Sequence, residues 1–291
     1  MRPLHLTLFL LAPLPAILLG AAVANAGASS ARAFLPNVLA CLLGGACALG
    51  FLRLSRAGRD RALHGMAIAT FIALVATLVS PGIEGVHRWL SIGPVRLNAS
   101  AAFLPWILAG MSASHPAVRK TSAVLALGAQ LIHLAQPDAA QASALAGGAL
   151  ALLVGNHLFG VAPRMALGGL MAVLAGFTWT RVDPLPAVDH VERILFLAAA
   201  RGPEWIGATL AVGALVLLVF LHAARNPHPA HARAAIGFGL YTALTLAVTF
   251  FGNFPVPWMG AGAGPVLGWY AFAAVLAAHE RQPRETSSLA I

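Results

Sequence analysis

Charged residues are scarce in this sequence. Asp, Glu, Lys and Arg make up only 9% of its 291 residues, and only 9 residues are acidic. Soluble globular domains carry about 25% charged residues, so this composition excludes a water-soluble enzyme. The chain is instead 59% hydrophobic with a mean hydropathy of +0.82, which is typical of a protein embedded in a lipid bilayer.

Cysteine is scarce as well. The chain has 2 cysteines, Cys41 and Cys47, and both fall within one apolar run. On a helix, two residues at this spacing point to different faces and cannot be joined by a disulfide. A disulfide framework is therefore excluded.

Long apolar runs, in contrast, are abundant. They approach the ~20 residues that a helix needs to cross a bilayer, and they lack the alternation of a barrel strand. Because backbone amides inside a bilayer must bond within the protein, we predict an all-α, polytopic transmembrane helical bundle. It is expected to form a single integral membrane domain over residues 1–291. Ten helices are predicted, at roughly 5–26, 34–53, 64–80, 97–114, 119–135, 138–156, 160–179, 204–224, 232–252 and 261–279.

The net charge of +9 would suggest a nucleic-acid partner for a soluble protein. In a membrane protein it instead indicates orientation, because basic residues concentrate in the loops of the inner side. Ten crossings put both termini on one side, which we assign to the cytoplasm, and no nucleic-acid partner is expected. The inner side then carries most of the basic residues: Arg2, Arg53, Arg56, Arg59, Arg61, Arg119, Lys120, Arg164, Arg225, Arg233, Arg281 and Arg284.

The first apolar run ends in Ala24-Asn25-Ala26, a pattern that is also found at signal-peptide cleavage sites. The run is long for a signal peptide and contains Pro13 and Pro15. Its removal would also place the two termini on opposite sides of the membrane. We therefore expect a retained first helix, with cleavage as the alternative.

Three predicted outer segments are long and polar enough to build a site: 81–100, 180–203 and 253–265. Charged groups beside a bilayer core are costly unless water, a partner or a charged ligand satisfies them. The first segment is therefore predicted to face a head-group site. Its titratable residues are Glu84, His87, Arg88 and Arg96.

The second outer segment contains the densest cluster of titratable groups in the chain. Its members are Arg181, Asp183, Asp189, His190, Glu192 and Arg193. Such a cluster supplies carboxylates for a general base and cations for a phosphate leaving group. A juxtamembrane loop of mutually neutralising charges would have the same composition, so both readings stay open.

Two further segments have alternative readings. In Gln136-Pro137-Asp138, the proline ends one helix and Asp138 is placed to cap the next, which we favour over a catalytic role. Segment 253–265 is too rich in Pro and Gly for a continuous helix. Irregular backbone near membrane depth usually lines a cavity, and a tight turn anchored by Trp258 is the equal alternative.

Five segments together carry a family pattern. They are Gly85 to Gly93 with Arg88-Trp89, Leu97 to Ser100, Gln136-Pro137-Asp138, Arg181 to Glu192, and Val256 to Gly260. In their order and predicted topology they resemble the SEDS family, the RodA/FtsW-type peptidoglycan glycosyltransferases. That family has G-x-R-R-W, Q-P-S-E, Q-P-D, D-P followed by L-P-E-x-H-T-D-F, and a final S-Y-G-G loop at these places.

The resemblance implies polymerisation of an undecaprenyl-pyrophosphate-linked disaccharide of the lipid II type, at the outer face of the bacterial inner membrane. It assigns the catalytic carboxylate to Glu192, with Asp189 and Asp183 as alternatives. A penicillin-binding-protein-type transpeptidase is the implied protein partner, and a divalent cation stays open as a cofactor because no ligand set specifies one. The implied substrate-binding residues are Arg88, Trp89, Gln136, Asp138, Arg181, His190 and Arg193.

Departures from the family pattern define the alternative function. The Gln and Glu of Q-P-S-E are absent, the Asp of H-T-D becomes Glu192, and the last loop loses its hydroxyls. A carboxylate displaced by about 1 Å loses on the order of a hundredfold in rate. The alternative is therefore a scaffold or a precursor-binding partner of a transpeptidase. A secondary transporter, the third hypothesis, needs polar residues at mid-membrane depth, and its candidates are Gln130, His133, Gln141 and Asn156.

Overall fold

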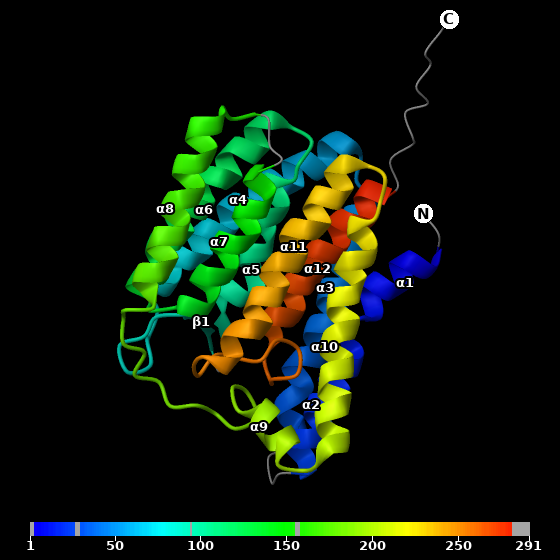
Figure 1. The fold of residues 1–291 in the computed structure, drawn as a ribbon, viewed down its shortest axis with the longest axis vertical. Helices are drawn as coiled ribbons and strands as arrows, with labels where there is room; N and C mark the ends of the chain where they lie inside the picture. The colour runs from blue at the N-terminus through cyan, green and yellow to red at the C-terminus, as the bar shows by residue number, and fades with distance from the viewer. Residues whose placement is uncertain (1–2, 27–29, 94, 155–157, 281–291) are drawn as a thin grey trace, which may run out of the picture.

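The computed structural model describes residues 3–26, 30–93, 95–154 and 158–280. Predictions that involve Arg2, Asn156, Arg281 and Arg284 lie outside these residues. The described chain is an all-α bundle whose long helices run side by side (Figure 1). The predicted fold class is confirmed.

Each predicted helix has a counterpart in the structure, with α1 and α2 together forming the first. These two are separated by a turn at residues 12–13, where Pro13 interrupts the helical hydrogen bonding. The helices are α1 (Pro3–Leu11), α2 (Leu14–Ala26), α3 (Leu35–Arg53), α4 (Arg56–Thr77), α5 (Ala99–Met111), α6 (Pro116–Ala135), α7 (Ala139–Val154), α8 (Val161–Thr178), α9 (Ile194–Ala199), α10 (Pro203–Ala224), α11 (Pro229–Ala247) and α12 (Ala263–Glu280), with the 3₁₀ turns η1 (Ala31–Phe34) and η2 (Val248–Phe250).

An antiparallel hairpin was not predicted from the sequence. It consists of β1 (Trp89–Ile92) and β2 (Val95–Asn98), in which Trp89 pairs with Asn98. In addition, α4 begins at Arg56, well before the predicted start at 64, because the Ser55 side chain accepts a hydrogen bond from the Gly58 N–H at 3.1 Å and caps the helix.

Within the described residues, five helical stretches are long and apolar enough to cross a membrane: Leu6–Ala26, Ala31–Arg53, Val161–Thr178, Pro203–Ala224 and Pro229–Phe250. Their outward faces carry exposed leucines, such as Leu42 and Leu43 on α3, which are 66% and 63% exposed. Apolar side chains exposed in this way match a lipid environment rather than water. The chain is a multi-pass membrane protein.

Helix α12 lies at the centre of the bundle and packs mainly against α3 and α5, while α7 packs against α11. Glycine allows these close contacts. A Cβ atom on Gly268 of α12 would lie 2.5 Å from the carbonyl oxygen of Ala101 on α5. Gly148 and Gly237 play the same part between α7 and α11, where each would clash with the other's helix. Small residues therefore let the helix backbones approach closely at these positions.

The polar connections gather at one end of the bundle, the lower end in Figure 1. They are the hairpin, the turn between α6 and α7, the long segment 179–193 before α9, and the segment 251–262 before α12. The opposite end carries the starts of α4, α6 and α11 and the end of α12.

Candidate functional site

Hydrogen bonds join segments 179–193 and 251–262 at the polar end. The backbone N–H of Val256 donates to the Val191 carbonyl at 3.2 Å, and that of Ala261 donates to the His190 carbonyl at 2.9 Å. Asn37 of α3 is fully buried and completes the arrangement, because its amide donates to the Gly260 carbonyl at 3.0 Å and accepts from the Gly262 N–H at 2.7 Å. These hydrogen bonds therefore hold segments 179–193 and 251–262 in fixed positions relative to each other.

Arg88 is the best-connected side chain at this end, although it is only 4% exposed. Its Nε donates to the Gln136 carbonyl at 3.2 Å, and its Nη2 donates to the Pro137 carbonyl. It also forms an ion pair with Asp183 at 2.8 Å and lies 3.8 Å from an oxygen of Asp138. A buried cation is stable only when it is paired and hydrogen-bonded, and both conditions are met here.

Asp138 has two roles in the structure. One carboxylate oxygen accepts a hydrogen bond from the Gln141 N–H at 3.2 Å and caps α7, which confirms the predicted cap. The other oxygen faces the guanidinium of Arg88. The cap therefore also orients a charged group toward the site.

Gln136 contacts both Arg88 and α4. Its carbonyl accepts the Arg88 Nε–H, while its side-chain amide donates to the hydroxyl of Thr77 on α4. The amide is buried and points away from the cavity described below. Gln136 is therefore placed to position Arg88 rather than to touch a ligand.

Glu192 lies just before α9 and is half-buried. Its Oε2 accepts a hydrogen bond from the Val188 N–H at 2.8 Å. Burial raises the pKa of Glu192, the nearby Asp183 carboxylate adds to this, and the Val188 N–H opposes it. The raised pKa of Glu192 lies closer to neutral pH than that of an exposed glutamate, which suits a general base.

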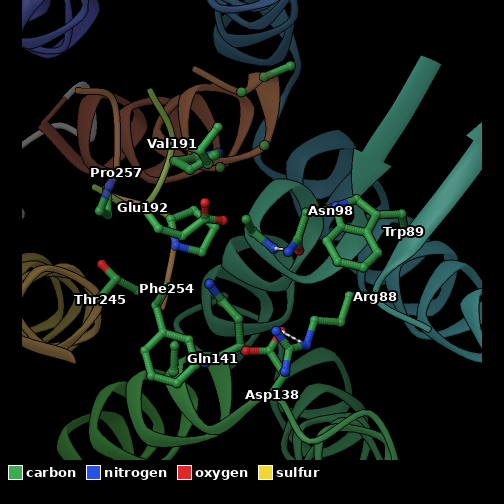
Figure 2. A pocket seen from close by; sticks show the side chains of 18 of the residues that line it. Arg88, Trp89, Asn98, Asp138, Gln141, Val191, Glu192, Thr245, Phe254 and Pro257 are labelled. Carbon is green, nitrogen blue, oxygen red and sulfur yellow. Dashed lines mark hydrogen bonds and ion pairs between the residues drawn. The ribbon is translucent and has the colours of Figure 1, made fainter. Parts of the chain in front are cut away.

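A cavity of about 380 Å³ lies between these segments. Figure 2 shows the Arg88 and Asp138 side chains on one side and Glu192 on the other, with Asn98 between them. Its inner wall is apolar and aromatic, and includes Trp269 and Phe272 of α12. Such a cavity has polar groups at defined points and an apolar wall, as ligand sites commonly do.

The structure brings some of the sequence-predicted residues together and leaves others apart. Arg88, Trp89, Asp138 and Glu192 line the cavity, and Asp183 contacts Arg88 from its edge. Of the other candidates, Asp189, Arg181 and Arg193 are exposed and His190 is half-buried, and none of them is among the lining residues. The charged residues of segment 179–193 are close together in sequence, but they do not all belong to one site.

One group of lining residues was missed from the sequence. Tyr241, Thr242 and Thr245 of α11 face the cavity, and the Tyr241 hydroxyl donates to the Gln141 side-chain oxygen at 2.7 Å. The sequence did contain a signal for this group, because polar residues recur at helical spacing from Tyr241 to Thr249. Among the described residues, no three His, Cys, Asp or Glu side chains are grouped in a way that could hold a metal ion.

Two polar residues of the transporter hypothesis form a closed network. Gln130 and His133 are fully buried, and His133 lies 3.1 Å from the Ser100 hydroxyl and 3.4 Å from Gln130 Oε1. The Gln130 amide donates to the carbonyls of Ala142 and Met171. These contacts are typical of helix packing in membranes and leave Gln130 and His133 outside the residues that line the cavity.

Comparison by sequence identifies no relative: no protein-family profile and no curated protein matches the chain. Comparison of structures does. The crystal structure of the rod shape determining protein RodA of Thermus thermophilus is similar with a TM-score of 0.70 at 17% identity, over 94% of this chain and 97% of that one. An aspartate-to-alanine mutant of the same protein gives a TM-score of 0.69 at 16% identity and the same coverage.

A third similar structure describes structural coordination of polymerization and crosslinking by a peptidoglycan synthase complex. It has a TM-score of 0.59 at 19% identity, over 91% of this chain and 97% of that one. At such identities the comparison establishes the fold. The chain has the RodA fold over nearly its whole length, and the resemblance seen in the sequence is confirmed at that level.

Proposed function

We propose that this chain is a SEDS-type glycosyltransferase that polymerises an undecaprenyl-pyrophosphate-linked disaccharide at the outer face of a bacterial inner membrane. The observation that carries the proposal is the placement of Arg88 and Glu192 around one cavity of about 380 Å³ in a RodA-like fold. A cation and a carboxylate of raised pKa facing the same space are the groups that this transfer requires.

Glu192 is the proposed general base. In this step the Glu192 carboxylate takes the proton of the acceptor sugar hydroxyl, and the hydroxyl oxygen forms a bond to the anomeric carbon of the donor. The bond from that carbon to the pyrophosphate breaks, with inversion, and the electron pair leaves with the undecaprenyl pyrophosphate. Of the three carboxylates proposed from the sequence, only Glu192 is a lining residue, while Asp183 is paired with Arg88 and Asp189 is exposed.

Arg88 is the proposed partner of the pyrophosphate. Its Nε and Nη2 are already bonded to carbonyls and Asp183, whereas its Nη1 makes no hydrogen bond with the described residues. Two N–H groups are therefore free to donate to a phosphate oxygen, and charge-assisted bonds of this kind are strong. Arg96 of β2 also lines the cavity and adds a second cation at its exposed edge.

The site end carries apolar groups suited to a lipid substrate. Phe250 and Phe251 follow α11 and are 69% and 75% exposed. In the sequence they come just before the cavity-lining segment 253–265. Exposed aromatic side chains at the end of a spanning helix are typical of a membrane interface. They support a position at the bilayer surface, where a polyprenyl chain stays in lipid while its sugar enters the cavity.

The test is polymer formation by the purified protein in liposomes that contain the lipid-linked disaccharide. Glu192→Gln is expected to lower the rate at least about a hundredfold, because general-base catalysis contributes about 10²–10⁴-fold. The matched control is Glu204→Gln, an exposed glutamate in the first turn of α10 that lies outside the cavity. Full activity of Glu192→Gln together with loss in Asp189→Asn would move the base to Asp189 and refute this assignment.

A non-catalytic scaffold is the second candidate. This candidate is favoured by Glu192, which stands where the family has an aspartate. The Glu192 carboxylate already accepts a hydrogen bond from the Val188 N–H of its own loop. The similar peptidoglycan synthase complex supports a transpeptidase partner under either proposal. Binding of the lipid-linked precursor without turnover, together with co-purification of such a partner, would establish the scaffold.

A further inference from the structure

A second cavity, of about 210 Å³, lies at the end of the bundle opposite the candidate site. It forms where α4, α6 and α11 begin and α12 ends. Its volume corresponds to about seven water molecules in the liquid. The ionisable residues that line it are Arg56, Arg119, His228, Arg233 and His279, and none of its described lining residues is acidic.

These basic residues act on one another. Arg233 is close enough to Arg119 for electrostatic repulsion, and the charges of Arg56 and His228 act on His279. One acid, Asp60, lies in an adjoining hollow, where its charge acts on Arg119 and one of its oxygens accepts the Ser114 N–H at 3.0 Å. Gathering like charges in a partly buried place is unfavourable unless an anion offsets them.

Two nitrogen atoms at this cavity are left without partners. Arg119 Nε and His279 Nδ1 are buried and make no hydrogen bond with the described residues. Buried polar atoms in proteins are nearly always hydrogen-bonded, so each unpartnered one calls for an explanation. A bound acceptor would satisfy Arg119 Nε, and it would also satisfy His279 Nδ1 when the imidazole carries its proton on that nitrogen. The guanidinium group also matches the geometry of a phosphate.

We propose that this cavity binds a phosphate group, supplied either by a soluble phosphate or by an anionic lipid headgroup. Arg119 and Arg233 would donate to its oxygens from α6 and α11. The cavity also lies at the first turns of α4 and α11, whose helix dipoles favour an anion. The proposal does not depend on the glycosyltransferase assignment, because the two cavities share no residue.

The test compares two probes on the purified protein in phosphatidylcholine nanodiscs. In one arm, inorganic phosphate replaces chloride at constant ionic strength while the unfolding temperature is followed. In the other arm, the nanodiscs contain phosphatidic acid, and native mass spectrometry counts the lipid that stays bound. Saturable stabilisation by inorganic phosphate supports the proposal with a soluble source, and retention of phosphatidic acid alone supports it with a lipid source.

Three variants make the test specific. The double variant Arg119→Gln/Arg233→Gln is expected to weaken the observed binding at least about tenfold, since each removes a charge-assisted hydrogen bond. Arg56→Gln changes an exposed residue that folding tolerates, and it is expected to weaken binding severalfold. Arg225→Gln, an exposed arginine at the same end that does not line the cavity, is expected to leave binding unchanged.

Absence of saturable binding to the unmodified protein in both arms would overturn the proposal. So would binding that Arg225→Gln weakens as much as Arg56→Gln does, because that result would indicate general surface charge.

Discussion

Arg88 connects three parts of the chain at one point. From the residue before β1 it reaches two carbonyls in the turn between α6 and α7, the cap of α7 and the segment before α9. Removing one partner of a buried ion pair leaves the others unsatisfied, which costs about 3–5 kcal/mol.

Arg88→Met is therefore expected to lower the free energy of unfolding by about 3–5 kcal/mol. The measurement is reversible denaturant unfolding of the protein in detergent micelles. Arg181→Met, which removes an exposed arginine from the same end, is expected to change stability by less than about 0.5 kcal/mol. Equal effects of the two substitutions would contradict the role assigned to the buried contacts.

The pKa of Glu192 predicts a pH dependence of polymerisation. Burial raises the pKa above the usual glutamate value of 4.5, so the side chain keeps its proton at pH values where an exposed glutamate has lost it. A general base must be ionised, so the rate is expected to rise with pH through this raised pKa and then level off. The measurement is the initial rate between pH 4 and 8, about the range where carboxyl and histidine groups titrate.

The control for this profile is the pH dependence of folding itself. Because the folded-state pKa is raised, the stability contribution of Glu192 is complete at low pH and is lost as the pH rises through that pKa. Loss of activity on the acid side therefore cannot come from Glu192 weakening the fold there. A rate that is independent of pH, or that falls as Glu192 ionises, would contradict its role as base.

At this scale, the sequence predicted the charged residues of the site better than the neutral ones. Arg88, Asp138 and Glu192 stand out because charge beside a bilayer is rare and costly. Thr245 did not, since a threonine hydroxyl in an apolar helix usually bonds to its own backbone, as that of Thr245 does to the Thr242 carbonyl. Which of the carboxylates in segment 179–193 faces inward depends on how that segment docks on 251–262, and spacing carries no such information.

At the scale of elements, the helices were predicted from the length of the apolar runs. Their ends depend on caps as well: the Asn98 side chain accepts the Ala101 N–H at 2.9 Å, and α5 begins two residues after the predicted start. The hairpin was not predicted, because two strands of four residues give too short an alternation to separate from the flanking runs. Its turn depends on Gly93, whose φ of +58° favours glycine.

Packing of α12 on α5 is tested by a matched pair of glycine substitutions. Gly268→Ala would place a methyl group 2.5 Å from the Ala101 carbonyl oxygen, so overpacking is expected to cost about 1–3 kcal/mol. Gly176→Ala on the exposed face of α8 meets nothing within 4 Å and is expected to be neutral or slightly stabilising. Thermal unfolding in detergent measures both, and equal transition temperatures would contradict the central position of α12.

At the scale of the whole molecule, the two ends of the bundle differ in character. One end holds a cavity between acidic and basic groups, and the other holds a cavity lined by basic residues. Basic residues collect on the inner side of membrane proteins, so we propose that the candidate site faces the outer side. The sequence predicted this asymmetry through its loops, but the two cavities appear only when the helices are assembled.

Single cysteines test this orientation in a protein whose Cys41 and Cys47 are replaced by alanine. Asp189→Cys lies on an exposed loop at the site end, and Arg225→Cys is exposed at the other end. A membrane-impermeant maleimide added to intact spheroplasts is expected to label position 189 alone, and position 225 only after permeabilisation. The reverse pattern would place the candidate site in the cytoplasm.

The most direct test of the proposed function is the structure of the protein in a lipid nanodisc with an undecaprenyl-pyrophosphate-linked disaccharide bound. The account predicts a phosphate oxygen within hydrogen-bonding distance of Arg88 Nη1 and a sugar hydroxyl within that distance of Glu192. A substrate held elsewhere, with the cavity of about 380 Å³ empty, would contradict it.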